Sequence, residues 1–191
     1  MTATLPPRLH PDRAAMLRQI LEWPEDDAPR LVFADYLDEI GEHDRAELIR
    51  GQINEWTTYA PVPKNGRFLL WGNQFLVPSA VDRVVVRRGF ISEIRLPCSA
   101  FMRHAREIFQ SHPVTRVVLA DCKAVELPGR SGALERGWHW PVGGGRNAIP
   151  WGLYDLMPDN PFPTESAALD ALSLACVQYG RELAGLRPLS A

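Results

Sequence analysis

The hydrophobic positions of the first 58 residues recur three and four apart, which is the pattern of helices that bury one face. The pattern predicts one helix over 13–23, which Pro24 ends, and a second helix with Pro29 in its first turn. A third helix is expected from His43–Asp44 to about residue 56. The residues expected to cap or end the second helix are Asp26 or Asp27 and Gly41. The side chains expected on the buried faces are Met16, Leu17, Ile20, Leu21, Phe33, Leu37, Ile40, Ala46, Ile49, Ile53 and Trp56.

From residue 81 the pattern changes to that of strands. Runs rich in β-branched residues at 83–86 and 90–96 are followed by a helix, with Ser99 as its expected cap, and by an apolar strand at 115–120. This order of strand, helix and strand predicts a βαβ unit. The periodicity leaves open whether the first two strands form a hairpin or two sequential edge strands.

Two irregular stretches accompany these elements. Residues 59–80 are rich in proline and are interpreted as a linker, with a short apolar piece at Phe68–Trp71. Residues 128–163 are rich in glycine and tryptophan. The last predicted helix has Thr164 as its cap and Gly185 at its end, and its apolar stripe favours core packing over docking onto a partner helix. The stripe consists of Leu169, Leu172, Cys176, Tyr179 and Leu183.

The segment Leu17–Gln52 resembles the repeat-companion domain, a short helical module at the N-termini of many planctomycete and some phage-associated proteins. Its marks here are Asp26-Asp27-Ala28-Pro29-Arg30-Leu31, Ala34-Asp35-Tyr36-Leu37-Asp38-Glu39, Gly41 and Ala46-Glu47-Leu48-Ile49-Arg50. Family members usually carry Trp at the position of Tyr36 and Phe at that of Leu48. The resemblance implies interaction rather than chemistry, because the family is associated with repeat scaffolds and has no established activity.

The segment Arg87–Cys122 is similar to the region that often follows in those proteins, where a strand, a helix and a second strand build leucine-rich-repeat-like units. About one such unit is present, which is too few for a horseshoe. The expected fold class is therefore α+β. A three-helix module over 1–58 and a proline-rich linker over 59–80 precede a leucine-rich-repeat-like βαβ unit with a loop-rich extension and a C-terminal helix over 81–191.

Composition narrows the class of protein. The chain has 191 residues and a net charge of −2, and its first residues lack the apolar core of a signal peptide. Its three cysteines show no CxxC spacing, so neither a disulfide framework nor a zinc cage is expected. No apolar run is long enough to cross a bilayer. We therefore expect a cytoplasmic protein without membrane partner, metal or cofactor, whose oligomeric state the sequence leaves open.

Catalytic motifs are not found in the sequence. The segment 129–133 fails the GxSxG pattern, and the glycines at 143–145 lack the Lys-Ser/Thr of a phosphate-binding loop. Four carboxylates share one face of the second helix, and we interpret them as a solvated acidic face rather than a metal or acid–base site. They are Asp35, Asp38, Glu39 and Glu42. A non-catalytic protein is expected.

Aromatic rings and guanidinium groups cluster in the glycine-rich stretch, in a combination enriched at protein-binding hot spots. The predicted partner-binding residues are Arg136, Trp138, His139, Trp140, Arg146 and Trp151. An acidic surface over 25–42 is the other expected contact surface. The leading hypothesis is a protein-interaction module, such as an adaptor or inhibitor of other machinery of the phage accessory type. Core cover by the tryptophans remains the competing interpretation.

The alternative hypothesis is a nucleic-acid-binding accessory protein that uses the arginine-rich strands together with the aromatic loop. It requires the strand arginines to gather on one solvent face, where they would contact phosphates. These arginines are Arg83, Arg87, Arg88 and Arg95.

Overall fold

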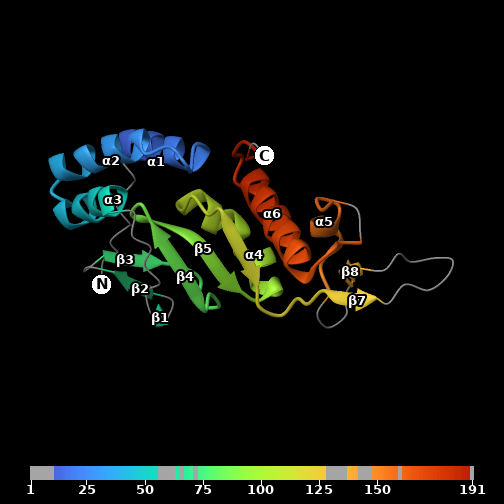
Figure 1. Cartoon of the computed structure of the whole chain (residues 1–191). Coiled ribbons are helices and arrows are strands. Elements are labelled where there is room, and N and C mark those ends of the chain that lie inside the picture. The colour runs from blue at the N-terminus through green and yellow to red at the C-terminus, as the bar shows by residue number, and fades with distance from the viewer. Residues whose placement is uncertain are drawn as a thin grey trace, which may run out of the picture.

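The structure is a computed structural model, which describes residues 11–55, 63–64, 67–70, 73–127, 137–141, 148–158 and 161–189. Helices and strands are both present, so the predicted α+β class is confirmed. Three N-terminal helices lie at one end of the molecule, and the C-terminal helix stands on the far side of the central sheet (Figure 1). The N-terminal helices are α1 (Pro11–Glu22), α2 (Ala28–Glu39) and α3 (His43–Glu55).

The described residues of the N-terminal helices follow the predicted apolar pattern except at Ile40, and the predicted core residue Trp56 lies outside the described residues. Gly41 adopts a φ of +83° after α2, as expected of a glycine that ends a helix. Ile40 was expected on the buried face, but that prediction is wrong, because its side chain is 46% exposed. The helix ends at Glu39, so Ile40 leaves the helical repeat and its side chain turns away from the core formed by Phe33 and Leu37.

The segment predicted as a linker contains three short strands. They are β1 (Pro63–Lys64), β2 (Arg67–Leu70) and β3 (Asn73–Leu76), which form an antiparallel sheet in this order. Lys64 pairs with Arg67 and Leu70 with Asn73, so two residues connect each pair of strands. Two-residue connections suit antiparallel hairpins, and the Asn65-Gly66 pair is a signal for one of them. The prolines of this segment favour loops, so the sequence predicted a linker instead of a hairpin.

The central sheet has the strand order β4-β5-β6. Strands β4 (Arg83–Arg87) and β5 (Phe90–Leu96) are antiparallel, so they form the hairpin that the sequence left open. Helix α4 (Cys98–Ser111) then crosses over to β6 (Arg116–Leu119), which runs parallel to β5. This confirms the predicted βαβ order.

Helix α4 begins two residues earlier than predicted. Its N-cap is Pro97 rather than Ser99, and the Cys98 N–H donates to the Asp121 side chain at 2.7 Å. The apolar face of α4 covers one face of the sheet. The buried residues in this contact include Phe101, Ala105, Ile108 and Phe109 from the helix and Val84, Ile94, Leu96 and Val117 from the strands.

Helix α6 (Glu165–Leu183) closes the edge of the sheet beside β6. The Val117 N–H of this edge strand donates to the Ser173 hydroxyl at 3.1 Å, which satisfies an edge donor without another strand. Thr164 caps the helix as predicted, because its Oγ1 accepts the Ala167 N–H at 3.1 Å. Leu169 was expected in the packed stripe, but that prediction is wrong, since its side chain is exposed.

The part between β6 and α6 contributes a small antiparallel pair and one short helix. They are β7 (Val125–Leu127), β8 (Gly137–His139) and α5 (Trp151–Tyr154). None of the helices in the described ranges combines the length and the apolar composition that are needed to span a membrane.

Two hydrophobic clusters form the core, and each contains a side chain from the other half of the chain. Leu48 of α3 belongs to the cluster between the sheet, α4 and α6. Phe90 of β5 belongs to the cluster of the N-terminal helices, where its ring lies 6.1 Å from that of Phe33. The N-terminal helices and the sheet are therefore packed into each other rather than separated by a linker.

Candidate functional site

One cavity of the described residues lies where the α1–α2 turn meets the C-terminal tail. We call it the Trp23 cavity, and its volume is about 720 Å³. The Trp23 side chain is 53% exposed, although large aromatic side chains are usually buried. The guanidinium of Arg187 lies over its ring, 5.6 Å from the ring centroid. The lining residues are Glu22, Trp23, Pro24, Glu25, Asp26, Thr115, Arg187, Pro188 and Leu189.

The buried Arg181 of α6 joins the two walls of this cavity. Its Nη groups donate to the carbonyls of Leu21 at 2.8 Å and Glu22 at 3.3 Å, and its Nε donates to the Arg187 carbonyl at 2.6 Å. The carbonyls of Leu21 and Glu22 belong to the last turn of α1, where no helical N–H is available to them. A single guanidinium therefore caps α1 and fixes the tail that carries Arg187.

Arg30 holds the other side of the cavity. It is 3% exposed and donates to the carbonyls of Pro24, at 2.6 Å, and Asp26. Its guanidinium also lies over the Phe90 ring, 5.8 Å from the centroid. The α1–α2 turn that carries Trp23 is thus fastened to the helical core, and Trp23 is exposed on a well-supported backbone.

Glu22 is a charged link between α1 and the tail. Its Oε2 accepts the Arg187 N–H at 3.0 Å, and its Oε1 pairs with Arg18 at 2.9 Å. Burial alone would raise the pKa of Glu22, but the Arg187 N–H and the Arg18 guanidinium favour the carboxylate. The net effect is a pKa below the ordinary value, so the folded protein prefers the ionised side chain.

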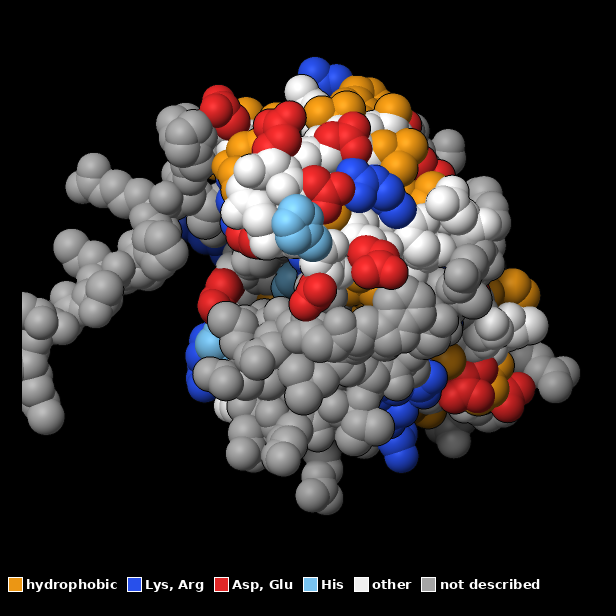
Figure 2. Space-filling view, turned by 90° about the vertical axis from the view of Figure 1, so that its left-hand side faces the viewer, with side chains coloured by type: hydrophobic (Ala, Val, Ile, Leu, Met, Phe, Trp, Pro, Cys, Tyr) orange, Lys and Arg blue, Asp and Glu red, His pale blue; other side chains and the backbone are white. Residues whose placement is uncertain are grey.

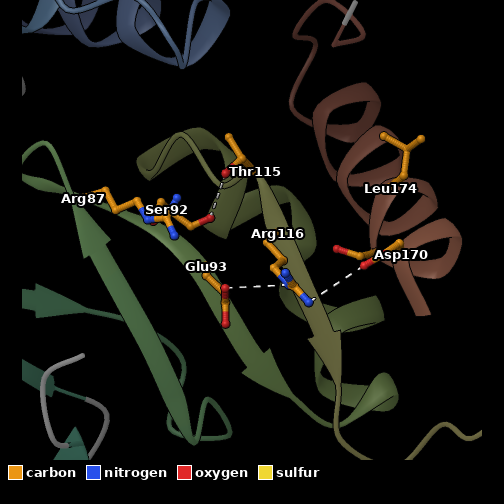
Figure 3. A pocket seen from close by; sticks show the side chains of 8 residues that line it. Arg87, Ser92, Glu93, Thr115, Arg116, Asp170 and Leu174 are labelled. Carbon is orange, nitrogen blue, oxygen red and sulfur yellow. Dashed lines mark hydrogen bonds and ion pairs between the residues drawn. The ribbon is translucent and has the colours of Figure 1, made fainter. Parts of the chain in front are cut away.

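A second cavity, which we call the Arg87 cavity, lies between the end of β4, the start of β6 and α6 (Figure 3). Its volume is about 310 Å³. Arg116 is placed between Glu93, at 3.7 Å, and Asp170, at 3.9 Å. The lining residues are Arg87, Ser92, Glu93, Thr115, Arg116, Asp170, Ser173 and Leu174.

Thr115, which directly precedes β6, lines both cavities, so they are adjacent at this residue. Its Oγ1 donates to the Ser92 carbonyl at 3.3 Å and its N–H to the same oxygen at 2.8 Å. This residue is therefore held by the sheet. We call the two cavities together the Thr115 groove. It is walled by the α1–α2 turn and the tail at one end and by the sheet and α6 at the other.

The predicted partner-binding loop is only partly described. Arg136 and Arg146 lie outside the described residues, as does the side chain of Trp151, whose backbone begins α5. Trp140 is 4% exposed, and its indole N–H donates to the Ala168 carbonyl at 3.2 Å. Its side chain therefore belongs to the core and not to an exposed contact surface.

The remaining two rings of that prediction lie close to Trp140 in sequence. Trp138 is half-buried against the main cluster, and its backbone pairs with Phe162. His139 is half-buried as well. The interpretation that the tryptophans cover the core thus fits the buried Trp140, and it fits the half-buried Trp138 in part.

The four strand arginines of the nucleic-acid hypothesis do not form one patch. Arg83 and Arg95 face each other across β4 and β5, and Arg95 pairs with Asp82 at 3.7 Å. Arg88 is directed to the α1–α2 turn, where it contacts Glu25 at 3.1 Å and Asp27 at 3.2 Å. Arg87 lines the Arg87 cavity. The single arginine cluster that the nucleic-acid hypothesis requires is therefore not formed by these four residues.

The predicted acidic face of α2 is matched largely within the N-terminal helices. Arg50 contacts both Asp35 and Asp38 at 2.6 Å, and Arg13 pairs with Glu42. Hydrogen bonds from His43 and Arg50 lower the pKa of Asp38. Figure 2 shows acidic and basic side chains interspersed over the described part of this end of the molecule. Over 35–42, the acidic surface is thus internally compensated.

The three cysteines are all buried, and none of them forms a disulfide bond. A hydrogen bond between Cys98 and Cys122 lowers the pKa of the Cys98 thiol and raises that of Cys122. Burial raises the pKa of Cys176. Within the described ranges, no three His, Cys, Asp or Glu side chains are grouped so that they could hold a metal ion.

Sequence reasoning missed the Thr115 groove, because its walls come from segments that are far apart in the sequence, such as 22–26 and 187–189. Trp23 lies two residues after Leu21, the last apolar residue of the α1 face, and directly precedes Pro24. A large aromatic residue just beyond a helix face is a weak signal for exposure, and its partner Arg187 carries no signal at all. Comparison of the chain with protein-family models, with curated proteins and with solved structures finds no match.

Proposed function

We propose that this chain is a non-catalytic protein-interaction module and that a segment of its partner binds in the Thr115 groove. The observation that carries the proposal is the exposed Trp23 ring under the Arg187 guanidinium, on the wall of a cavity of about 720 Å³. Tryptophan and arginine are the residues most enriched where binding energy concentrates. Binding sites are also concave and largely preformed, as the Arg30 and Arg181 contacts make this groove.

The resemblance of 17–52 to the repeat-companion domain supports the same reading. Trp23, Glu25 and Asp26 lie within that segment and line the Trp23 cavity. The groove therefore uses the N-terminal end of the expected acidic surface over 25–42, whereas the buried Trp140 argues against the loop as the main contact. An adaptor or an inhibitor of other machinery would need only such a recognition groove.

The proposal can be tested by photo-cross-linking in lysate of the source cells. The photoreactive residue p-benzoylphenylalanine replaces Trp23, so an aromatic ring is retained in the cavity. The matched control carries the same residue at Leu169, which is also exposed but lines neither cavity. Each sample is irradiated with and without prior nuclease treatment.

A discrete protein adduct at position 23 that survives nuclease and is absent at position 169 supports the proposal. The wild-type chain in excess should suppress this adduct, and a Trp23→Ala chain should not. Adducts that are equal at both positions would contradict it. Cross-links to nucleic acid at position 23 would replace the proposal with the nucleic-acid hypothesis.

A further inference from the structure

We infer that the partner segment is acidic and apolar, with one apolar side chain in the Trp23 cavity and carboxylates at Arg187 and Arg87. This inference rests on the proposed function of the groove. It follows from comparing the charged groups of the groove that already have partners with those that do not.

The carboxylates along the groove are nearly all matched by cations of the chain itself. Glu22 pairs with Arg18 and Glu25 with Arg88. Arg116 lies between Glu93 and Asp170. The last carboxylate, Asp26, accepts the Ala28 N–H at 2.9 Å at the start of α2. A basic partner would therefore compete with contacts that are already made.

Two guanidinium groups of the groove differ from this pattern, one in each cavity. Within the described ranges, neither Arg187 nor Arg87 forms an ion pair with a carboxylate, and both are exposed. Arg187 instead lies over the Trp23 ring, which leaves its edge N–H groups available. An arginine binds a carboxylate through two parallel hydrogen bonds, which are stronger than those between neutral groups.

The apolar requirement comes from the wall of the Trp23 cavity. Trp23, Pro24, Pro188 and Leu189 all line the larger cavity. The removal of such apolar surface from water favours binding. One aliphatic or aromatic side chain placed against Trp23 would bury this wall. Arg187 would then lie at its edge, where it can bind a neighbouring carboxylate.

A peptide fits this groove better than a nucleic-acid strand does. Glu25, Asp26, Glu93 and Asp170 line the same two cavities, and a phosphate backbone carries a charge at every nucleotide. Such a strand would place phosphates beside these carboxylates. A peptide can place its few carboxylates at Arg87 and Arg187 alone.

The inference is tested by selection from a displayed library of random dodecapeptides against the full chain. The enriched peptides are then synthesised with a fluorophore, and their affinities are measured by anisotropy. The variants are Arg87→Gln and Arg187→Gln. The control is Arg83→Gln, which removes an exposed arginine at the other end of β4, outside both cavities. A single-stranded DNA dodecamer serves as a second probe.

We expect enriched peptides that contain Asp or Glu beside a large apolar residue. Their affinity should fall about tenfold or more in each of Arg87→Gln and Arg187→Gln, because each variant removes a charge-assisted contact. It should change less than about twofold in Arg83→Gln, and Trp23→Ala should also weaken binding.

Three further outcomes bear on this inference and on the proposed function. Enriched peptides that are basic or uncharged, and that depend on Trp23 but not on the two arginines, would overturn the acidic partner while the groove remains a binding site. No enrichment, together with no protein adduct at position 23, would overturn both. Binding of the DNA probe that depends on Arg87 and Arg187 would show that the site takes phosphates.

Discussion

The backbone N–H of Gly89 donates a hydrogen bond of 2.7 Å to the buried side-chain oxygen of Gln52. The amide nitrogen of the same Gln52 donates to the Val86 carbonyl at 3.3 Å. Arg88 and Gly89 form the tip of the β4–β5 hairpin, and both have positive φ, as a tight two-residue turn requires. One side chain of α3 therefore satisfies the tip of the sheet hairpin and joins the two halves of the chain.

Substitution of Gly89 by alanine should destabilise the protein by about 2 kcal/mol or more. A Cβ there would lie 2.3 Å from Ile49 Cγ1 and 2.9 Å from Ile49 Cα, and the φ of +76° is unfavourable for alanine. The measurement is the free energy of unfolding from urea titration.

The matched control for this substitution is Gly41→Ala. Gly41 also has a positive φ, of +83°, but a Cβ at this position would meet no atom within 4 Å. The Gly41→Ala substitution should therefore lower the free energy of unfolding by only about 1 kcal/mol, because alanine is unfavourable at a positive φ. Equal losses at the two positions would show that α3 does not pack against the hairpin tip as described.

Substitution of Arg181 by methionine should destabilise the protein by about 2–4 kcal/mol and should also loosen the tail. The variant leaves the carbonyls of Leu21, Glu22 and Arg187 without their buried donor. Urea titration gives the loss of stability, and hydrogen exchange of residues 186–189 reports the tail. The exposed Arg18→Met should cost less than about 1 kcal/mol. An Arg181→Met variant of wild-type stability would contradict the joining role of Arg181.

Glu22 should make stability depend on pH in the acid range. Its pKa is lower in the folded protein than the ordinary 4.5, so its contribution is fully present above that pH. The contribution is lost as the pH falls through the folded-state pKa. The stability difference between the wild type and Glu22→Gln should therefore shrink between about pH 5 and pH 2. Urea titrations over this range test the expectation, and Glu182→Gln controls for the change in net charge. A constant difference would contradict it.

Local periodicity predicted most of the fold, because the pattern of a helix face or a strand is determined by a few consecutive residues. It failed at Ile40 and Leu169, which both fit the apolar spacing. Ile40 is exposed because it lies beyond the last residue of α2. Leu169 is exposed because the adjacent Ala168, rather than Leu169, takes the buried position in the first turns of α6.

The candidate site was harder to predict from the sequence than the fold was. Trp23 and Arg187 are adjacent only because Arg181 joins the end of α1 to the tail. Nothing in the local spacing of these residues specifies that contact. The sequence did predict a contact surface built from tryptophan and arginine. It placed this surface in the glycine-rich stretch, where these residues are most frequent, but Trp140 in that stretch is buried.

Trp140 and Trp23 should therefore respond in opposite ways to the same substitution. Trp140→Ala removes a buried ring and leaves the Ala168 carbonyl without the indole donor, so we expect a loss of about 3–5 kcal/mol. Trp23→Ala removes a ring that is half in solvent, so its loss of stability should stay near or below about 1 kcal/mol. Partner binding should show the reverse order once stability is accounted for. Urea titration and cross-linking competition measure the two effects. The opposite result would be a folded Trp140→Ala chain that no longer competes for the partner and a Trp23→Ala chain that competes fully. That result would show that the contact surface lies in the glycine-rich loop.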